Sequence, residues 1–156
     1  MSSLKTLLFA TDFSSGAAKA SAAAATLARL SGARLHVIHA AILIERFLYG
    51  ATDFAVSGAD EKRMNETIVK ESEKALDEFV TRYFKSAETG VVENLESRVI
   101  KSSMPHESII EEAERIGADI IILGTHGRSG LERVLMGSTA ERVMRSSPIP
   151  VLTSRG

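Results

Sequence analysis

The chain has 156 residues, of which 44% are hydrophobic and 25% are charged, and this balance is typical of a folded globular protein rather than a disordered chain. The 19 lysine and arginine residues nearly balance the 20 acidic residues, so the net charge gives no support to binding of nucleic acid or of an anionic membrane. The lack of cysteine excludes disulfides, thiolate metal ligands and thiol catalysis, and it favours a cytoplasmic location.

The first predicted elements are a short strand and a helix. Thr6 to Ala10, TLLFA, is a continuous apolar run, which predicts a strand covered on both faces. The run is too short for a signal peptide or a membrane span. Ser14 or Ser15 is expected to begin an alanine-rich helix that ends near Gly32 and lies close to a sheet.

Apolar runs and helical patterns alternate along the rest of the chain. We expect strands at residues 34–40, 94–100, 119–123 and 148–154, and helices at about 60–83, 105–116 and 138–145. Residues 41–58 have no clear period but contain Phe47, Tyr49 and Phe54. We interpret them as a variable lid or interface segment within a single domain of residues 1–156, although these aromatic side chains could simply cover the core.

This alternation predicts an α/β fold, an open doubly wound sheet of five parallel strands with helices on both faces. In such sheets, ligands bind beyond the carboxyl ends of the strands, where the direction of winding reverses. Two segments follow strands in this way, TDFS at residues 11–14 and GTHG at residues 124–127. We therefore expect the binding site to include both segments.

The second segment opens a glycine-rich stretch, GTHGRSGLERVLMGSTAERV. Gly124, Gly127 and Gly130 permit positive φ and close approach of a ligand to the backbone. Gly137 comes directly before a predicted helix, whose first N–H groups attract an anion.

We therefore expect a phosphate to bind the amides near Gly127 and Ser138, with the hydroxyls of Ser138 and Thr139 beside it. Alternatively, the glycines only shape a turn and Ser138 only caps the helix. Asp12, in the same way, could simply cap the first helix.

Better-known phosphate and metal motifs do not fit. Gly137 is followed by Ser138 with no lysine, unlike a P-loop, and the glycine spacing differs from the dinucleotide fingerprint. The histidines lack metal-ligand spacing, and His36 and His39 share a strand but point to opposite faces. His126, Arg128 and Arg133 fit an ordinary surface as well as a phosphate site.

Three separated motifs resemble the ATP-binding type of the universal stress protein family. The pattern Gly124-x-x-Gly127, nine residues, then Gly137-Ser138 is similar to its ATP-binding motif, and ATDFS at 10–14 and PIPVL at 148–152 are similar to its opening and closing strands. The motifs occur in the family's order over essentially the whole chain. The resemblance implies an adenine-nucleotide alpha-hydrolase-like sheet of order 3-2-1-4-5, in which Asp12 and Gly124 are neighbours.

The resemblance also implies the ligand and its contacts. The ligand is ATP, with Mg as the nucleotide complex; Asp12 lies by the adenosine and the backbone of Ala40 meets the adenine, while the glycines and Ser138 hold ribose and phosphates. The implied nucleotide-binding set is Ala10, Thr11, Asp12, Ala40, Leu123, Gly124, Gly127, Gly137, Ser138 and Thr139. The family often has proline in place of Ala10 and glycine in place of Ser103, departures that concern the shape of loops.

We interpret the chain as a cytosolic, nucleotide-dependent regulator or sensor of the stress response, because no residue is identifiable as orienting a water for ATP hydrolysis. A slow ATPase or phosphotransferase using the same site, and a nucleotide-free interaction module, remain alternatives. The resemblance implies a homodimer through the last strand, which would otherwise leave a pairing edge exposed.

Overall fold

The computed structural model describes residues 3–45, 57–125 and 137–155. Strands and helices alternate along the chain as the sequence predicts, in the order β1 (Thr6–Ala10), α1 (Ser15–Ser31), β2 (Arg34–Ile42), α2 (Gly58–Phe84), β3 (Leu95–Ser102), α3 (Pro105–Ile116), β4 (Ile120–Gly124), α4 (Ser138–Ser146) and β5 (Val151–Ser154). Across the described ranges, none of these helices combines the length and the apolar character that a membrane span needs.

Four of the five strands differ from the predicted ranges by one to three residues at an end, and two of these differences have a clear cause. β2 runs past Ala40 to Ile42 because it stays paired with β3 as far as Ser102. β5 begins only at Val151, since Pro148 and Pro150 have no N–H to donate to a neighbouring strand.

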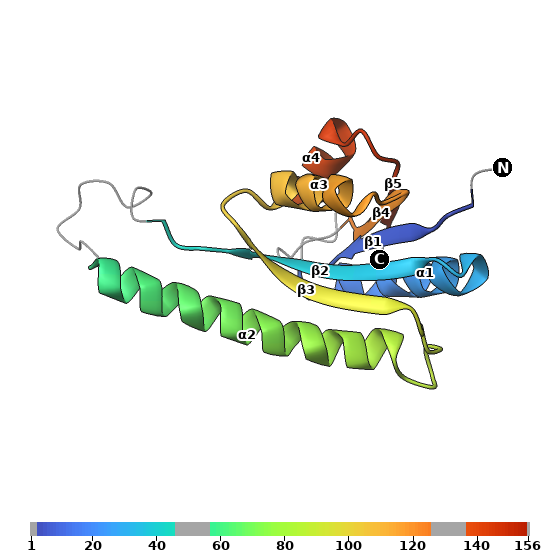
Figure 1. The fold of residues 1–156 in the computed structure, drawn as a ribbon, viewed down its shortest axis with the longest axis horizontal. Helices are drawn as coiled ribbons and strands as arrows, with labels where there is room; N and C mark the ends of the chain where they lie inside the picture. The colour runs from blue at the N-terminus through green and yellow to red at the C-terminus, as the bar shows by residue number, and fades with distance from the viewer. Residues whose placement is uncertain (1–2, 46–56, 126–136, 156) are drawn as a thin grey trace.

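The strands form one parallel sheet of order β3-β2-β1-β4-β5, which confirms the predicted fold class and strand order. β1 lies at the centre, where Ala10 pairs with Ile38 of β2 on one side and with Leu123 of β4 on the other. The winding direction reverses between β1 and β4. Their carboxyl ends therefore meet at the same edge of the sheet, as Figure 1 shows.

A hydrophobic core lies on each face of the sheet. Leu7 and Phe9 of β1 pack into the core formed with α1 and α2, whereas Leu8 and Ala10 pack into the core formed with α3 and α4. Figure 1 shows α3 and α4 above the sheet and α2 below it. The continuous apolar run of β1 follows directly from burial on both faces.

The α1 helix meets the sheet through small side chains, as predicted. Its buried residues are Gly16, Ala17, Ala20, Ser21, Ala24, Ala25 and Ala28. The Ser14 hydroxyl caps the helix by accepting the N–H of Ala17, and Gly32 ends it in the left-handed conformation at φ 69°. Small residues allow the helix backbone to approach the strands closely.

A charged cluster joins α3 to β3. The carboxylate of Glu112, whose side chain is 7% exposed, accepts hydrogen bonds from Arg115 at 2.7 and 2.8 Å and from Arg98 of β3 at 3.0 Å. The hydrogen bonds from Arg115 hold the pKa of Glu112 below its ordinary value, and the nearby charge of Arg98 lowers it further. The cluster therefore stabilises the docking of α3 while Glu112 is ionised.

We predict that Glu112→Gln lowers the free energy of unfolding near neutral pH by about 1 kcal/mol, because it removes charge-assisted hydrogen bonds to two half-exposed arginines. Since the pKa of Glu112 is lower in the folded chain than in the unfolded one, this stabilisation is present above the ordinary glutamate range and is lost as the pH falls through the folded pKa. The variant should accordingly lose less stability than the unsubstituted protein between neutral pH and about pH 4. Urea denaturation at both pH values measures this, and Glu111→Gln, an exposed neighbour on α3, is the matched control.

Candidate functional site

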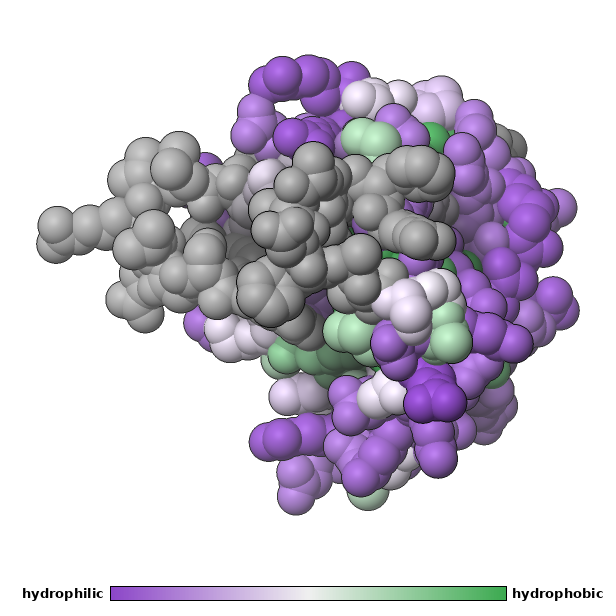
Figure 2. All heavy atoms as spheres, turned by 90° about the vertical axis from the view of Figure 1, so that its left-hand side faces the viewer, coloured by the Kyte–Doolittle hydropathy of each residue, from purple (hydrophilic) through white to green (hydrophobic). Residues whose placement is uncertain are grey.

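A cavity of about 510 Å³ lies at the carboxyl ends of β1, β2 and β4. Its volume falls within the range of roughly 300 to 1,000 Å³ that is usual for ligand pockets. Figure 2 views the molecule toward this edge, where apolar surface lies among hydrophilic side chains. The lining residues are Ala10, Thr11, Asp12, Ala17, His39, Ala40, Ala41, Ile42, Ile68, Ser72, Pro105, Ile109, Leu123, Gly124, Gly137, Ser138, Thr139 and Ala140.

The cavity brings together the predicted site residues that the structure describes. Those from β1, its following turn, β2, β4 and the start of α4 all line it, namely Ala10, Thr11, Asp12, Ala40, Leu123, Gly124, Gly137, Ser138 and Thr139. Gly127 lies outside the described residues, as do Gly130, His126, Arg128, Arg133, Phe47, Tyr49 and Phe54. The contacts of these residues with a nucleotide remain a prediction.

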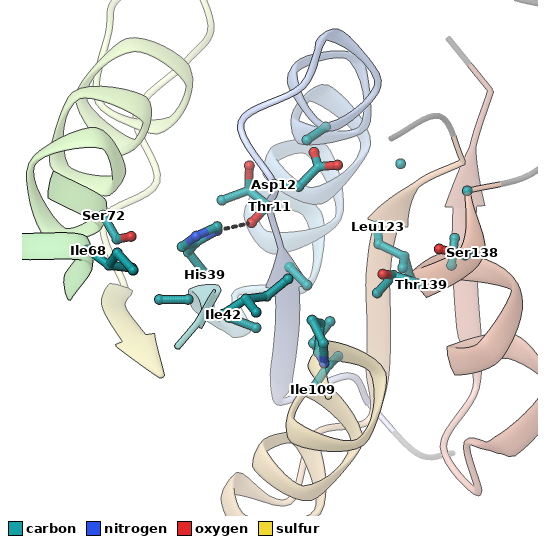
Figure 3. Close-up of a pocket in the computed structure, with 18 residues that line it drawn as sticks. Thr11, Asp12, His39, Ile42, Ile68, Ser72, Ile109, Leu123, Ser138 and Thr139 are labelled. Atoms are coloured by element: carbon teal, nitrogen blue, oxygen red, sulfur yellow. Dashed lines mark hydrogen bonds between the residues drawn. The ribbon is translucent and has the colours of Figure 1, made fainter. Parts of the chain in front are cut away.

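Other lining residues were not expected from the sequence. Ile68 and Ser72 of α2 stand on the side of the cavity opposite Ser138 and Thr139 of α4 (Figure 3), and Ile109 comes from α3. Their helical spacing indicates only that they belong to amphipathic helices. His39 and Ile42 could have been found from their place at the end of β2, beside the end of β1.

The turn between β1 and α1 is held by side-chain-to-backbone hydrogen bonds. The Thr11 hydroxyl accepts the N–H of Phe13 at 3.0 Å, and Asp12 Oδ1 accepts the N–H of Ser14 at 3.0 Å. Ser14, rather than Asp12, is the residue that caps α1. Asp12 therefore organises the turn at the rim of the cavity and lines the cavity as well.

His39 contacts the same turn from β2. Its Nδ1 lies 2.8 Å from the carbonyl oxygen of Thr11, a contact drawn as a dashed line in Figure 3. Its ring lies 4.3 Å from the ring of Phe13, centroid to centroid. Phe13 has a φ of 64°, an uncommon conformation for a bulky residue.

The start of α4 provides backbone donors. Gly137 is the N-cap residue, and no side chain of the described residues caps the helix, so the alternative that Ser138 serves as its cap is wrong. The first-turn N–H groups of Ser138, Thr139 and Ala140 have no acceptor within the described part of the chain, and all three residues line the cavity. Such a helix start favours an anion.

Thr125, which the sequence did not single out, fixes the approach to α4. It is 4% exposed, and both its N–H and its hydroxyl donate to the carbonyl of Ser154 in β5 at 3.1 Å. Its own carbonyl accepts the N–H of Gly137. The end of β4, the end of β5 and the start of α4 are thus joined at one buried residue.

Gly124 has a packing role that the sequence did not reveal. The described glycines with positive φ are Gly32, Gly90 and Gly117, so Gly124 does not use the positive φ that glycine permits. Instead, a Cβ at Gly124 would lie 2.5 Å from the carbonyl carbon of Gly16, inside α1. Bare backbone at this position allows α1 to pack against the end of β4.

The cavity lining has no basic side chain in the described part of the chain, so at α4 it relies on backbone N–H groups and hydroxyls. Among its described lining residues, Asp12 is the one acidic side chain and none is lysine or arginine. Within residues 3–45, 57–125 and 137–155, no three histidine or acidic side chains gather as a metal site would require. The donors facing the cavity at α4 are therefore amides and hydroxyls.

Comparison with known proteins agrees with this architecture. The family model of the Universal stress protein family matches residues 3–155. A universal stress protein of Methanocaldococcus jannaschii is 32% identical over 157 residues, which cover 95% of this chain and 93% of that protein. The universal stress protein YxiE of Bacillus subtilis is 32% identical over 152 residues, covering 96% and 97% respectively.

Solved structures share the fold over nearly the whole chain. The universal stress protein UspA of Lactobacillus plantarum has a TM-score of 0.77 at 23% identity, covering 99% of this chain and 100% of its own. A universal stress protein in complex with cAMP has a TM-score of 0.60 at 21% identity, covering 99% and 98%. One from Archaeoglobus fulgidus in complex with dAMP has a TM-score of 0.56 at 19% identity, covering 97% and 98%.

We predict that Gly124→Ala destabilises the ligand-free protein by about 1 to 3 kcal/mol, because the added methyl group overlaps the backbone of Gly16 and Ala17. Thermal or urea unfolding without nucleotide measures this. Gly58→Ala is the control, since a Cβ there meets no atom within 4 Å, and its stability should be unchanged or slightly higher. An unchanged melting temperature in Gly124→Ala would show that the helix and strand are not in close contact.

Proposed function

This chain belongs to the universal stress protein family, and on that premise we propose that it binds ATP in the cavity at the ends of β1, β2 and β4 and acts in the cytoplasm as a nucleotide-dependent regulator or sensor of the stress response. The observation that carries the proposal is the convergence of two distant segments. Asp12 lines the same cavity as Gly124, Gly137 and Ser138. In the sequence, the five elements from α1 to α3 separate Asp12 from the other three residues.

The α4 side of the cavity suits the phosphates. Ser138, Thr139 and Ala140 present first-turn N–H groups, and the first two also carry hydroxyls. Because the N–H of Gly137 donates to Thr125, we place the phosphate contacts on the amides that follow it. Hydrogen bonding and the helix dipole together favour an anion at this position without a basic side chain.

The opposite part of the cavity suits the adenine base. Ala40, Ile42 and Ile109 give it apolar walls, which favour a flat aromatic ring. Backbone N–H and C=O groups near the end of β2 can form hydrogen bonds with the polar edge of the base. Two solved structures of this fold contain a universal stress protein in complex with an adenine nucleotide, cAMP in one and dAMP in the other. They support an adenine nucleotide as the class of ligand.

Magnesium would enter with ATP. It would neutralise part of the phosphate charge. The described cavity lining contains no lysine or arginine that could do so. The hydroxyls of Ser138 and Thr139 and the carboxylate of Asp12 are oxygen groups of the kind magnesium prefers. The chain's own residues hold and orient the nucleotide.

We predict that saturating Mg-ATP raises the melting temperature by roughly 5 to 10 °C when it is present at about 100 times its Kd, as expected for a ligand that binds only the folded state. Gly137→Val should abolish most of this shift, because its side chain would stand beside the phosphate site. Its φ of −53° and ψ of 140° are open to other residues, so the melting temperature without ligand should change little. Differential scanning fluorimetry measures both quantities.

Two further observations decide the result. Denaturing freshly purified protein and chromatographing the released small molecules should yield adenine nucleotide if the ligand stays bound during purification. No melting shift at millimolar Mg-ATP, together with no released nucleotide, would refute ATP binding. Collapse of the ligand-free fold in Gly137→Val would indicate that the glycine serves only the turn.

We also propose a homodimer through β5, which forms an outer edge of the sheet with residues of intermediate exposure. The carbonyl of Pro150 accepts the N–H of Ile121 in β4, and the carbonyl of Ser154 accepts the N–H of Thr125 just after β4. The alternation of a strand therefore turns the N–H groups of Val151 and Thr153 outward. A second β5 could pair with them.

We therefore predict that Thr153→Pro converts the dimer to a monomer while the β4–β5 hydrogen bonds persist, since proline removes an outward N–H. Light scattering at tens of micromolar protein measures the mass, with Thr153→Ala as the control that retains the N–H. A monomeric unsubstituted protein would refute dimerisation, and a dimeric proline variant would refute pairing through this edge.

A further inference from the structure

We propose that His39 is a positioning residue for nucleotide binding. It holds the β1–α1 turn so that Asp12 faces the cavity in the binding geometry. This inference rests on the proposed function, since it concerns the same cavity, and it adds a residue from outside the glycine motif.

The hydrogen bond fixes which ring nitrogen carries the proton. A carbonyl oxygen only accepts, so the Nδ1 that lies 2.8 Å from the Thr11 oxygen must be the protonated nitrogen. The N–H of Thr11 in turn donates to the carbonyl of Ile38 at 2.9 Å. Both backbone polar groups of Thr11 are therefore bonded to β2, although β1 itself ends at Ala10.

This bond acts on Asp12 through the peptide plane. The carbonyl of Thr11 and the N–H of Asp12 belong to one planar unit, so a donor held against the oxygen fixes the rotation of the whole unit. From there the turn is closed by the Asp12 carboxylate on the N–H of Ser14 at 3.0 Å. A shift of the Thr11 carbonyl would thus be passed directly to the Asp12 side chain.

The neighbouring backbone needs such support. Phe13 adopts a φ of 64°, a strained conformation for a bulky side chain that persists only where its surroundings hold it. The imidazole of His39 is the nearer of the two rings described against Phe13, at 4.3 Å and inclined by 30°, and the other is Phe79 at 6.1 Å. One side chain therefore supports the turn by both a hydrogen bond and ring packing.

His36 offers a natural comparison. It lies on the same strand and is separated from Glu96 by 3.6 Å, between Nδ1 and Oε2. It does not belong to the cavity lining. A substitution there changes a histidine of β2 without touching the turn.

The test compares two substitutions of His39. His39→Leu removes the donor and should raise the Kd for Mg-ATP about tenfold, as expected for loss of one well-placed hydrogen bond. His39→Asn places an amide N–H at nearly the position of Nδ1 and should restore most of the affinity. His36→Leu should leave the Kd unchanged. Titration calorimetry measures the Kd, and melting without ligand confirms that each variant folds.

A double-mutant cycle with Asp12→Asn shows whether His39 acts through the turn, because residues that act as a unit are not additive. The losses of affinity from His39→Leu and Asp12→Asn should then sum to more than the loss in the double variant. Additive losses, or an unchanged Kd in His39→Leu, would overturn the role of His39 while leaving ATP binding intact. Absence of binding by the unsubstituted protein would instead refute the proposed function.

If His39→Leu does not fold, nitrogen NMR of the imidazole in the unsubstituted protein decides the question. A proton on Nδ1 in the nucleotide complex, with the affinity retained in His39→Asn, supports the proposal. A proton confined to Nε2 would overturn it.

Discussion

The pairing of β1 with β4 is the interaction on which the site depends. Because both strands run in the same direction and pair side by side, the turn after Ala10 and the glycine segment after Leu123 meet at one edge, although more than a hundred residues separate them. Burial of both faces of β1 stabilises this arrangement, since its side chains enter two separate cores. Neither segment would form a cavity alone. The free energy that holds them together comes from packing elsewhere in the sheet.

Small residues let the cavity form where a helix and a strand approach closely. The absence of a side chain at Gly124 leaves room for the backbone of Gly16, and the alanine face of α1 continues the same close contact along the sheet. The glycine thus has two consequences at once, since it also lines the cavity. The same residue thus permits the close packing of α1 and forms part of the cavity wall.

The anion site that we propose needs no basic side chain in a nearly neutral protein. The described lining of the cavity contains Asp12 and no lysine or arginine, and the proposed donors are the N–H groups at the start of α4. Thr125 fixes that helix start by joining it to the ends of β4 and β5. Rigid backbone donors lose little entropy when a ligand binds, which is an advantage over long flexible lysine or arginine side chains.

The sequence by itself determined the order of strands and helices and the parallel sheet, because these depend on local signals such as apolar runs, the cap at Ser14 and the helix stop at Gly32. Half of the cavity lining was also predicted, from the spacing of the glycine motif and from the family resemblance. The strand order rested on the family resemblance and is confirmed. Only the tertiary structure decided why Gly124 is bare, which residues of α2 face the cavity, and that Thr125 and His39 hold its rim. Those contacts join elements that are distant in the chain, and their geometry follows from how helices and strands pack rather than from any pattern within one segment.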